Sequence, residues 1–251
     1  MTNLLATEPA GTPAAAVPVP AAGDADVAAA ARLIGEPARA TMLEALMAGK
    51  ALAAGELARL AGVSPATASE HLARLRDGGL VTTVATGRHR YYRLASPEVA
   101  QVLEALALVS PPRPVKSLRQ SRAILAMSGA RTCYDHLAGR VGVGIHDALT
   151  ARGALRVGPD GYELTAAGEL YLVGLGVDVT AARARRRSFA RPCLDVTERR
   201  PHLAGALGAA ICGRLLDGGW LVHRAAGQRG LRVTDTGRDR LAAEFGVAVE
   251  P

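Results

Sequence analysis

"GELARLAGVSPATASEHLARLRDGGLV", residues 55–81, is the stretch that decides the fold. Residues 55–60 predict a short helix, and the Ala-Gly-Val sequence around Gly62 predicts a tight turn after it. Ser64 directly before Pro65 is the favoured order of a cap and a first helical residue, so a second helix is expected to begin here and to end at the glycine pair. Two short helices joined by a sharp turn make a helix-turn-helix.

The two faces of this motif differ in chemistry. Apolar residues at helical spacing predict an inward face, formed by Leu57, Leu60, Val63, Ala68, Leu72 and Leu75. The outward positions are candidate DNA contacts, namely Ser64, Thr67, Ser69, Glu70, His71 and Arg74. Hydroxyl, imidazole and guanidinium groups bind base edges and phosphates, so the second helix is predicted to enter the major groove of duplex DNA.

The flanking segments add the rest of a winged helix. Helices are predicted at Asp26–Leu33 and Pro37–Met47, and a further helix begins at Ser96. Val81–Val84 and Tyr91–Leu94 predict a β-hairpin, or wing. Its tip carries three basic candidate DNA contacts, Arg88, His89 and Arg90. The formal net charge is +7, but acidic and basic residues balance over Asp24–Ser110, so DNA binding is argued from this local pattern rather than from bulk charge.

The sequence resembles the arsenic-repressor (ArsR-type) family of winged-helix regulators over Asp26–Val109. The resemblance rests on "GEPARATMLEAL", the stretch quoted above and "TGRHRYYRL". It implies a homodimer built from the first and last helices, a near-palindromic operator and repression. It also implies base contacts from Ser64–Arg74 and a wing contact from Arg88 and Arg90. Two metal sites known in this family have no counterpart, because Ala51–Arg59 contains no Cys and Ser96–Ser110 contains neither Asp nor His.

The chain divides into four predicted parts. Residues 1–23 are rich in Ala and Pro and are expected to be a disordered tail, and 24–110 form the winged helix-turn-helix. Residues 111–132 are a linker with a helix, and 133–251 are a sensing and dimerisation domain. The last part repeats itself, with units of about 133–180 and 193–250, since "HLAGRVGVGIHDALTARGAL" parallels "HLAGALGAAICGRLLDGGWL". Each unit is predicted as helix, two short strands and helix, so the fold class is mainly α (α+β).

Each repeat unit also carries a cluster of metal-ligand residue types. Together the candidates are Cys133, Asp135, His136, Cys193, Asp195, Glu198 and His202. A thiolate with imidazole and carboxylate suits Zn(II)-like metals, and two thiolates brought together would suit arsenite or Hg(II). A thiol of lowered pKa would instead sense oxidants, and buried cysteines that act as small apolar residues remain the simplest alternative. Cys212 is expected in the core.

Other classes of protein fit less well. The sequence contains no phosphate loop, dinucleotide fingerprint or HExxH motif, and a Cys133/His136 nucleophile would lack a recognisable oxyanion hole. No apolar run reaches the roughly 20 residues of a membrane helix, and no export signal is recognised, so a cytoplasmic protein is expected. A DNA-binding protein without an effector, whose positive C-terminal part clamps flanking DNA, stays open as an alternative.

Overall fold

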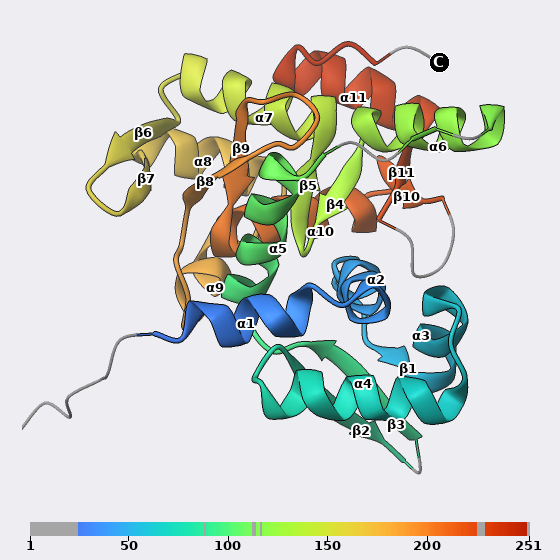
Figure 1. The fold of residues 1–251 in the computed structure, drawn as a ribbon. Coiled ribbons are helices and arrows are strands. Elements are labelled where there is room, and N and C mark those ends of the chain that lie inside the picture. The colour runs from blue at the N-terminus through green and yellow to red at the C-terminus, as the bar shows by residue number, and fades with distance from the viewer. Residues whose placement is uncertain (1–24, 88, 112–113, 116, 225–228, 250–251) are drawn as a thin grey trace, which may run out of the picture.

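The computed structural model describes residues 25–87, 89–111, 114–115, 117–224 and 229–249 (Figure 1). The predicted tail, 1–23, lies outside these residues. The N-terminal region, 25–111, comprises α1 (Val27–Ile34), α2 (Pro37–Leu46), β1 (Leu52–Ala53), α3 (Ala54–Ala61), α4 (Pro65–Asp77), β2 (Val81–Thr86), β3 (His89–Leu94) and α5 (Pro97–Val109).

The N-terminal region is the predicted winged helix-turn-helix. Gly62 ends α3 in the left-handed conformation with φ of 67°, and the Ser64 hydroxyl caps α4 by accepting a hydrogen bond from the Thr67 amide at 3.2 Å. The strands form an antiparallel sheet in the order β1-β3-β2, whose β2–β3 hairpin is the wing. In Figure 1, α4 and the wing lie on the side of the molecule that faces away from the C-terminal region.

The core of this region follows the predicted pattern with one exception. Leu57, Leu72 and Leu75 are fully buried, together with Met42 and other residues of α2. Leu60 was expected inside but is 55% exposed. The buried face of α3 is instead formed by Leu57 together with the alanines at positions 54, 58 and 61. Leu60 therefore lies at the edge of that face.

The C-terminal region, 117–249, consists of helices and short two-stranded sheets. Its elements are α6 (Leu118–Gly129), β4 (Arg131–Cys133), β5 (His136–Ala138), α7 (Gly139–Ala151), β6 (Leu155–Gly158), β7 (Gly161–Leu164), α8 (Ala166–Gly174), α9 (Val179–Arg183), β8 (Arg191–Leu194), β9 (Pro201–Ala204), α10 (Gly205–Asp217), β10 (Leu221–His223), β11 (Leu231–Val233) and α11 (Asp235–Phe245). The strands pair as β4-β5, β6-β7, β8-β9 and β10-β11, each pair antiparallel.

The first part of each repeat unit differs from the expectation. The predicted order of helix, two strands and helix is present as α7–β6–β7–α8 and as α10–β10–β11–α11. A further hairpin precedes each first helix, however, so that the His-Leu-Ala of each unit lies in a strand and not in a helix. Strands of three or four residues leave too short an alternating pattern for sequence periodicity to detect.

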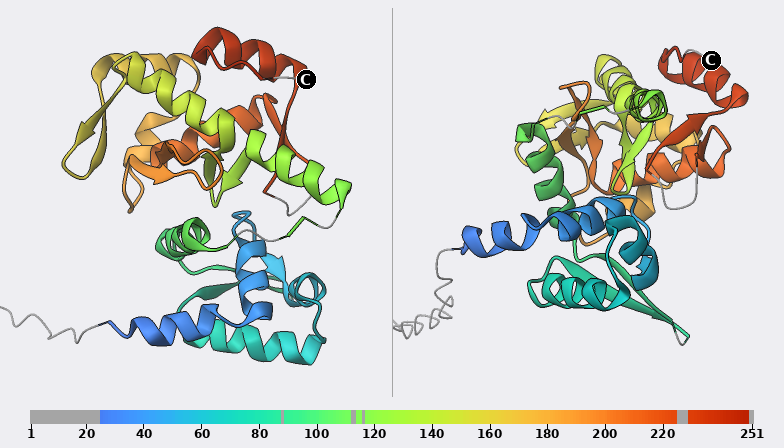
Figure 2. Two further views of the ribbon diagram at one scale, coloured as in Figure 1. Left: turned by 45° about the horizontal axis from the view of Figure 1, so that its top comes forward. Right: turned by 45° about the vertical axis from the view of Figure 1, so that its right-hand side comes forward.

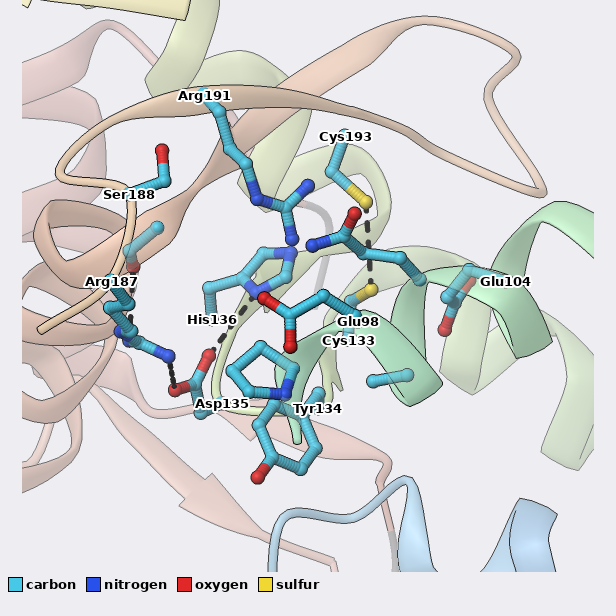
Figure 3. Close-up of a pocket in the computed structure, with 14 residues that line it drawn as sticks. Glu98, Glu104, Cys133, Tyr134, Asp135, His136, Arg187, Ser188, Arg191 and Cys193 are labelled. Atoms are coloured by element: carbon cyan, nitrogen blue, oxygen red, sulfur yellow. Dashed lines mark hydrogen bonds and ion pairs between the residues drawn. The ribbon is translucent and has the colours of Figure 1, made fainter. Parts of the chain in front are cut away.

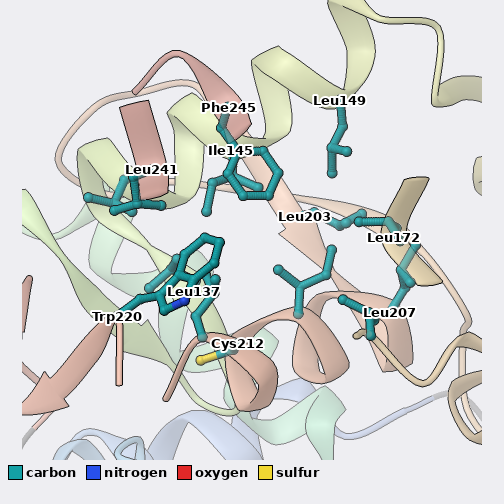
Figure 4. Packing of buried hydrophobic residues seen from close by; sticks show 14 of the residues in the cluster. Leu137, Ile145, Leu149, Leu172, Leu203, Leu207, Cys212, Trp220, Leu241 and Phe245 are labelled. Atoms are coloured by element: carbon teal, nitrogen blue, oxygen red, sulfur yellow. The ribbon is translucent and has the colours of Figure 1, made fainter. Parts of the chain in front are cut away.

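A shared apolar core joins the two units (Figure 4). It includes Leu149 and Leu172 from the first unit and Leu207 and Leu241 from the second, all fully buried. Cys212 is also in this core, as expected. In the part of the chain that the structure describes, no helix is long and apolar enough to cross a bilayer.

The N- and C-terminal regions meet around α5. Two further views show α5 at the junction, between the remaining N-terminal elements and the C-terminal hairpins (Figure 2). Its side chains face three ways: Val99 and Leu103 pack on the N-terminal core, Glu104 is buried, and Val109 is exposed. Whatever changes the C-terminal hairpins is therefore placed to act on this helix.

Candidate metal centre and nucleic-acid interface

The two N-terminal hairpins of the repeat units bring cysteine and histidine together. In the first hairpin Cys133 is the cross-strand partner of His136, and in the second Cys193 is the partner of His202. Cross-strand partners project on the same face of a hairpin, so each hairpin presents one thiol and one imidazole. β5 and β9 lie next to each other, which turns the two pairs toward a common centre.

The four donor atoms form one compact group. All of them lie within 4.8 Å of one another, with 3.8 Å between the two Sγ atoms and 3.1 Å between the two histidine Nε2 atoms. Cys133, His136 and His202 are buried, and Cys193 is half-buried. Figure 3 shows the two sulfur atoms facing each other, with His136 beside them.

These distances fit a tetrahedral ion. With Zn–S near 2.3 Å and Zn–N near 2.0–2.1 Å, a tetrahedron has S···S and N···N edges of about 3.8 Å and about 3.3 Å. The observed 3.8 Å and 3.1 Å match both edges closely. The residue types and these two distances therefore fit a Cys2His2 metal centre, and the full spread of the four donor atoms, up to 4.8 Å, leaves room for the hairpins to close on an ion.

Each histidine is backed by the aspartate of its own repeat unit. Asp135 Oδ1 lies 3.4 Å from His136 Nδ1, and Asp195 Oδ2 lies 3.6 Å from His202 Nδ1. A carboxylate bonded to Nδ1 orients the ring and makes Nε2 a better metal ligand, which applies to His136. His202 Nδ1 has no hydrogen-bond partner among the residues that the structure describes, and Asp195 lies just beyond bonding distance of it. The sequence grouped both aspartates with the ligands, whereas the structure places them behind the histidines.

Asp195 also connects the two units. Its carboxylate accepts from Arg131 Nη2 at 2.9 Å and from the Gly139 amide at 2.7 Å, both in the first unit. The Thr197 hydroxyl and amide also donate to it, as does the Glu198 amide. Burial works to raise the pKa of Asp195, but Arg131 and these hydrogen bonds outweigh it and hold the pKa well below its usual range.

The two thiols are electrostatically unequal. The hydrogen bond between them lowers the pKa of Cys193, and hydrogen bonds with His136 and His202 lower it further, against the effect of burial. The same bond and burial raise the pKa of Cys133. Burial lowers the pKa of His136, but its hydrogen bonds to Asp135 and Cys193 prevail and raise it. The lowered pKa favours the thiolate form of Cys193, which is the form that binds metal ions.

The remaining predicted ligand and two unpredicted arginines complete the surroundings. Glu198 lies outside the four-ligand group, on the loop of the β8–β9 hairpin, where its amide donates to Asp195 Oδ1. Arg187 binds Asp135 Oδ2 at 2.6 Å, and Arg131 has the same role on Asp195. Sequence reasoning missed both arginines, although Arg-x-Cys recurs in the two units and could have pointed to Arg131.

A cavity of about 160 Å³ separates this centre from α5 (Figure 3). Cys133, His136 and Cys193 line one side of it, and Glu98 and Glu104 of α5 line the other. The centre therefore lies directly opposite the helix that joins the two regions.

The expected DNA contacts mostly lie together on the exposed face of α4. Exposed side chains there are Ser64, Thr67, Ser69, Glu70 and Arg74. His71 differs, because it is largely buried, with Nδ1 3.7 Å from the Glu36 carboxylate at the start of α2. Its Nδ1 is buried beside that carboxylate without a hydrogen bond to any described residue, so this nitrogen faces α2 and not outward. Arg90 is exposed on the wing, Arg88 lies outside the described residues, and His89 is placed by its backbone in β3.

Comparisons with known proteins agree with this N-terminal architecture. Residues 34–84 match a family model described as a helix-turn-helix domain. The HTH-type transcriptional regulator YgaV of Escherichia coli is 32% identical over 85 residues, which are 34% of this chain and 86% of YgaV. Among solved structures, NolR from Sinorhizobium fredii is 31% identical with a TM-score of 0.30, over 32% of this chain and 79% of NolR.

A longer similarity includes the C-terminal region. YdfF of Bacillus subtilis, described as an uncharacterized HTH-type transcriptional regulator, is 43% identical over 213 residues. These residues are 85% of this chain and 94% of YdfF, so the metal-centre region is part of the match. The chain belongs to the family of helix-turn-helix transcriptional regulators.

Proposed function

We propose that the protein is an ArsR-type, homodimeric, cytoplasmic repressor whose operator binding is controlled by a metal ion held by Cys133, His136, Cys193 and His202. One observation carries this proposal, namely that four potential ligand atoms from two separate hairpins lie within 4.8 Å of one another in a largely buried centre. A buried group of four such donors is costly to leave without a shared cation or a complete set of hydrogen bonds. In this proposal the metal-sensing site lies in the C-terminal repeat units and not in the winged helix.

The donor set favours one class of metal. Tetrahedral S2N2 coordination suits Zn(II) and its close substitutes Co(II) and Cd(II). Arsenite and Hg(II) prefer sulfur alone, and the centre offers two sulfurs and two imidazoles. With four protein ligands the coordination is complete, so the ion would hold the two hairpins together and leave no position for a substrate.

The dimer is proposed from α1 and α5. Val27 of α1 and Val102, Leu106 and Val109 of α5 are exposed, which is unfavourable for a lone chain and typical of a surface covered by a second copy. In a dimer the two α4 helices must match successive major grooves about 34 Å apart. An ion that shifts α5 would change this spacing and so release the operator.

A titration of the reduced protein on its upstream DNA tests the proposal. We expect Zn(II) to weaken operator binding by roughly 5–150-fold, the usual range of coupling between two sites. The double variant Cys133→Ser, Cys193→Ser should bind the operator normally and no longer respond. Cys212→Ser is the matched control, because Cys212 is buried in the core away from the centre. Equal responses of wild type and the double variant would reject this site.

Thiol oxidation is a second candidate function, favoured by the 3.8 Å between the two sulfurs. Hydrogen peroxide would oxidise the Cys193 thiolate to a sulfenic acid with loss of hydroxide. The Cys133 sulfur would then displace the sulfenic oxygen, so that two thiols and one peroxide give one disulfide and two waters. Peroxide that releases the operator from metal-free protein, with loss of two free thiols, would favour this function. Release by Zn(II) under reducing conditions would favour the first.

A further inference from the structure

We infer that Tyr134, at the tip of the β4–β5 hairpin, transmits the state of the metal centre to the DNA-binding region. The inference rests on the proposed function and adds the route by which it operates. Tyr134 follows the ligand Cys133 directly and precedes the ligand His136 by two residues. Any movement of the hairpin on metal binding therefore includes this residue.

Tyr134 belongs to the C-terminal region by sequence and to the N-terminal core by contact. Its side chain packs on the apolar cluster that includes Met47 after α2 and Leu52 of β1. Burial in that position raises the pKa of its hydroxyl. Figure 3 shows the Tyr134 ring pointing away from the sulfur atoms, toward the N-terminal elements.

The backbone of Tyr134 makes an equally close contact. A Cβ atom added to Gly49 would lie 2.5 Å from the Tyr134 carbonyl oxygen, so only glycine leaves room for the hairpin tip. Gly49 lies just after α2, which packs against α3 and α4 of the helix-turn-helix. The tip thus contacts the turn directly after α2, the helix that packs against α4.

The backbone conformation of Tyr134 links metal binding to the position of the hairpin tip. Its φ is 61°, a left-handed value that costs a non-glycine residue free energy and persists only where the surroundings impose it. Cys133 and His136 on either side are the residues that a bound ion would fix in place. The ion would therefore stabilise the strained tip, and its loss would allow the tip to relax away from α2.

A second contact supports the same hairpin. Thr132, on the other side of Cys133, accepts from Arg229 Nε at 2.9 Å, and Arg229 forms an ion pair with the buried Glu104 of α5. The other hairpin touches the N-terminal region more lightly, through Arg199 Nη1, which donates to the Leu108 carbonyl oxygen at 3.3 Å. The β4–β5 hairpin is consequently the better mechanical link to the DNA-binding region.

Tyr134→Gly tests the inference, because glycine removes the ring and accepts the left-handed φ without strain. We expect the full-length variant to bind Zn(II) with an affinity within about threefold of wild type. The factor by which Zn(II) weakens operator binding should fall at least tenfold. If that factor is below ten in wild type, Zn(II) should have no effect on the variant. Since coupling is reciprocal, operator DNA should also lose its effect on Zn(II) affinity in this variant. Tyr134→Phe keeps the ring and should retain the wild-type response.

The outcomes separate this inference from the proposed function. A wild-type protein that binds no Zn(II), or ignores it on the operator, would contradict the proposed function itself. A wild-type response that persists in Tyr134→Gly would overturn only the inference. Should Tyr134→Gly lower Zn(II) affinity, Gly49→Ala decides, because its added Cβ would displace the Tyr134 tip from the N-terminal side without changing a residue of the metal-binding hairpins. Reduced coupling with intact Zn(II) binding supports the route, and undiminished coupling overturns it.

Discussion

The β4–β5 and β8–β9 hairpins carry the same Cys-x-Asp and His residues but use them differently. Both supply one thiol and one imidazole to the centre. Asp195 of the second hairpin is fully buried and joins the two units, whereas the Asp135 side chain is 30% exposed and paired with Arg187. The comparison indicates that the second hairpin is fixed to the first unit through a buried carboxylate, whereas the first hairpin contacts the N-terminal region.

The largest expected effect is a loss of Zn(II) affinity, and it should be the same for the two hairpins. Cys133→Ser and Cys193→Ser each remove one of four ligands, so each should weaken Zn(II) binding by about a hundredfold or more, given that whole structural sites contribute about 10–16 kcal/mol. Competition with a chromophoric chelator measures the affinity. A large loss for one variant and none for the other would show that the hairpins do not share a single ion.

Substitution of the two aspartates should have different effects on the free energy of unfolding. Asp195→Asn leaves Arg131 buried without a counter-charge, and we expect a loss of about 3 kcal/mol in the free energy of unfolding. Asp135→Asn breaks a partly exposed ion pair and should cost about 1 kcal/mol. Urea unfolding of the metal-free proteins measures both, and equal losses would contradict the assigned difference.

The contribution of Asp195 to the free energy of unfolding should depend on pH. The pKa of Asp195 is lower in the folded protein than in the unfolded chain, so its stabilising contribution is complete above about pH 4 and is lost as the pH falls further. Asp195→Asn cannot titrate, and its unfolding free energy should fall less steeply than that of wild type between pH 5 and pH 3. Parallel curves for wild type and variant would argue against the depressed pKa.

The smallest effect belongs to Glu198. It lies on the β8–β9 loop outside the group of four donors, so Glu198→Gln should leave Zn(II) affinity within twofold of wild type. The same chelator competition measures it. A tenfold loss of Zn(II) affinity would indicate that the Glu198 carboxylate is a ligand. The second hairpin would then supply three ligands and not two.

The sequence predicted the winged helix well because its signals are local. Ser64 and Pro65 mark the start of α4, and glycine marks the turn before it. His71 was misplaced because its outward position on α4 says nothing of Glu36, which is distant in sequence and meets it only in the folded chain. Leu60 illustrates the same point, since a short helix does not define its own buried face.

The candidate centre was predicted in part. The recurrence of Cys-x-Asp and His in the two units named all four residues that the fold brings together, and similarity between repeats placed them at equivalent positions. The separation of ligands from supporting aspartates depends on the hairpins, whose three- and four-residue strands leave no readable period. Arg187 and Tyr134 act across the fold, and no spacing in the chain reveals such contacts.

Titration of the metal-free, reduced protein with Co(II) tests the central claim most directly, because the absorption of Co(II) reports both geometry and thiolate ligation. The account predicts one ion per chain, with the intense d–d bands of a tetrahedral site and a sulfur-to-metal charge-transfer band. That band should lose about half its intensity in Cys193→Ser and should be absent from the Cys133→Ser, Cys193→Ser variant. Weak bands typical of six-coordinate Co(II), or a spectrum unchanged by these substitutions, would contradict a Cys2His2 centre between the two hairpins.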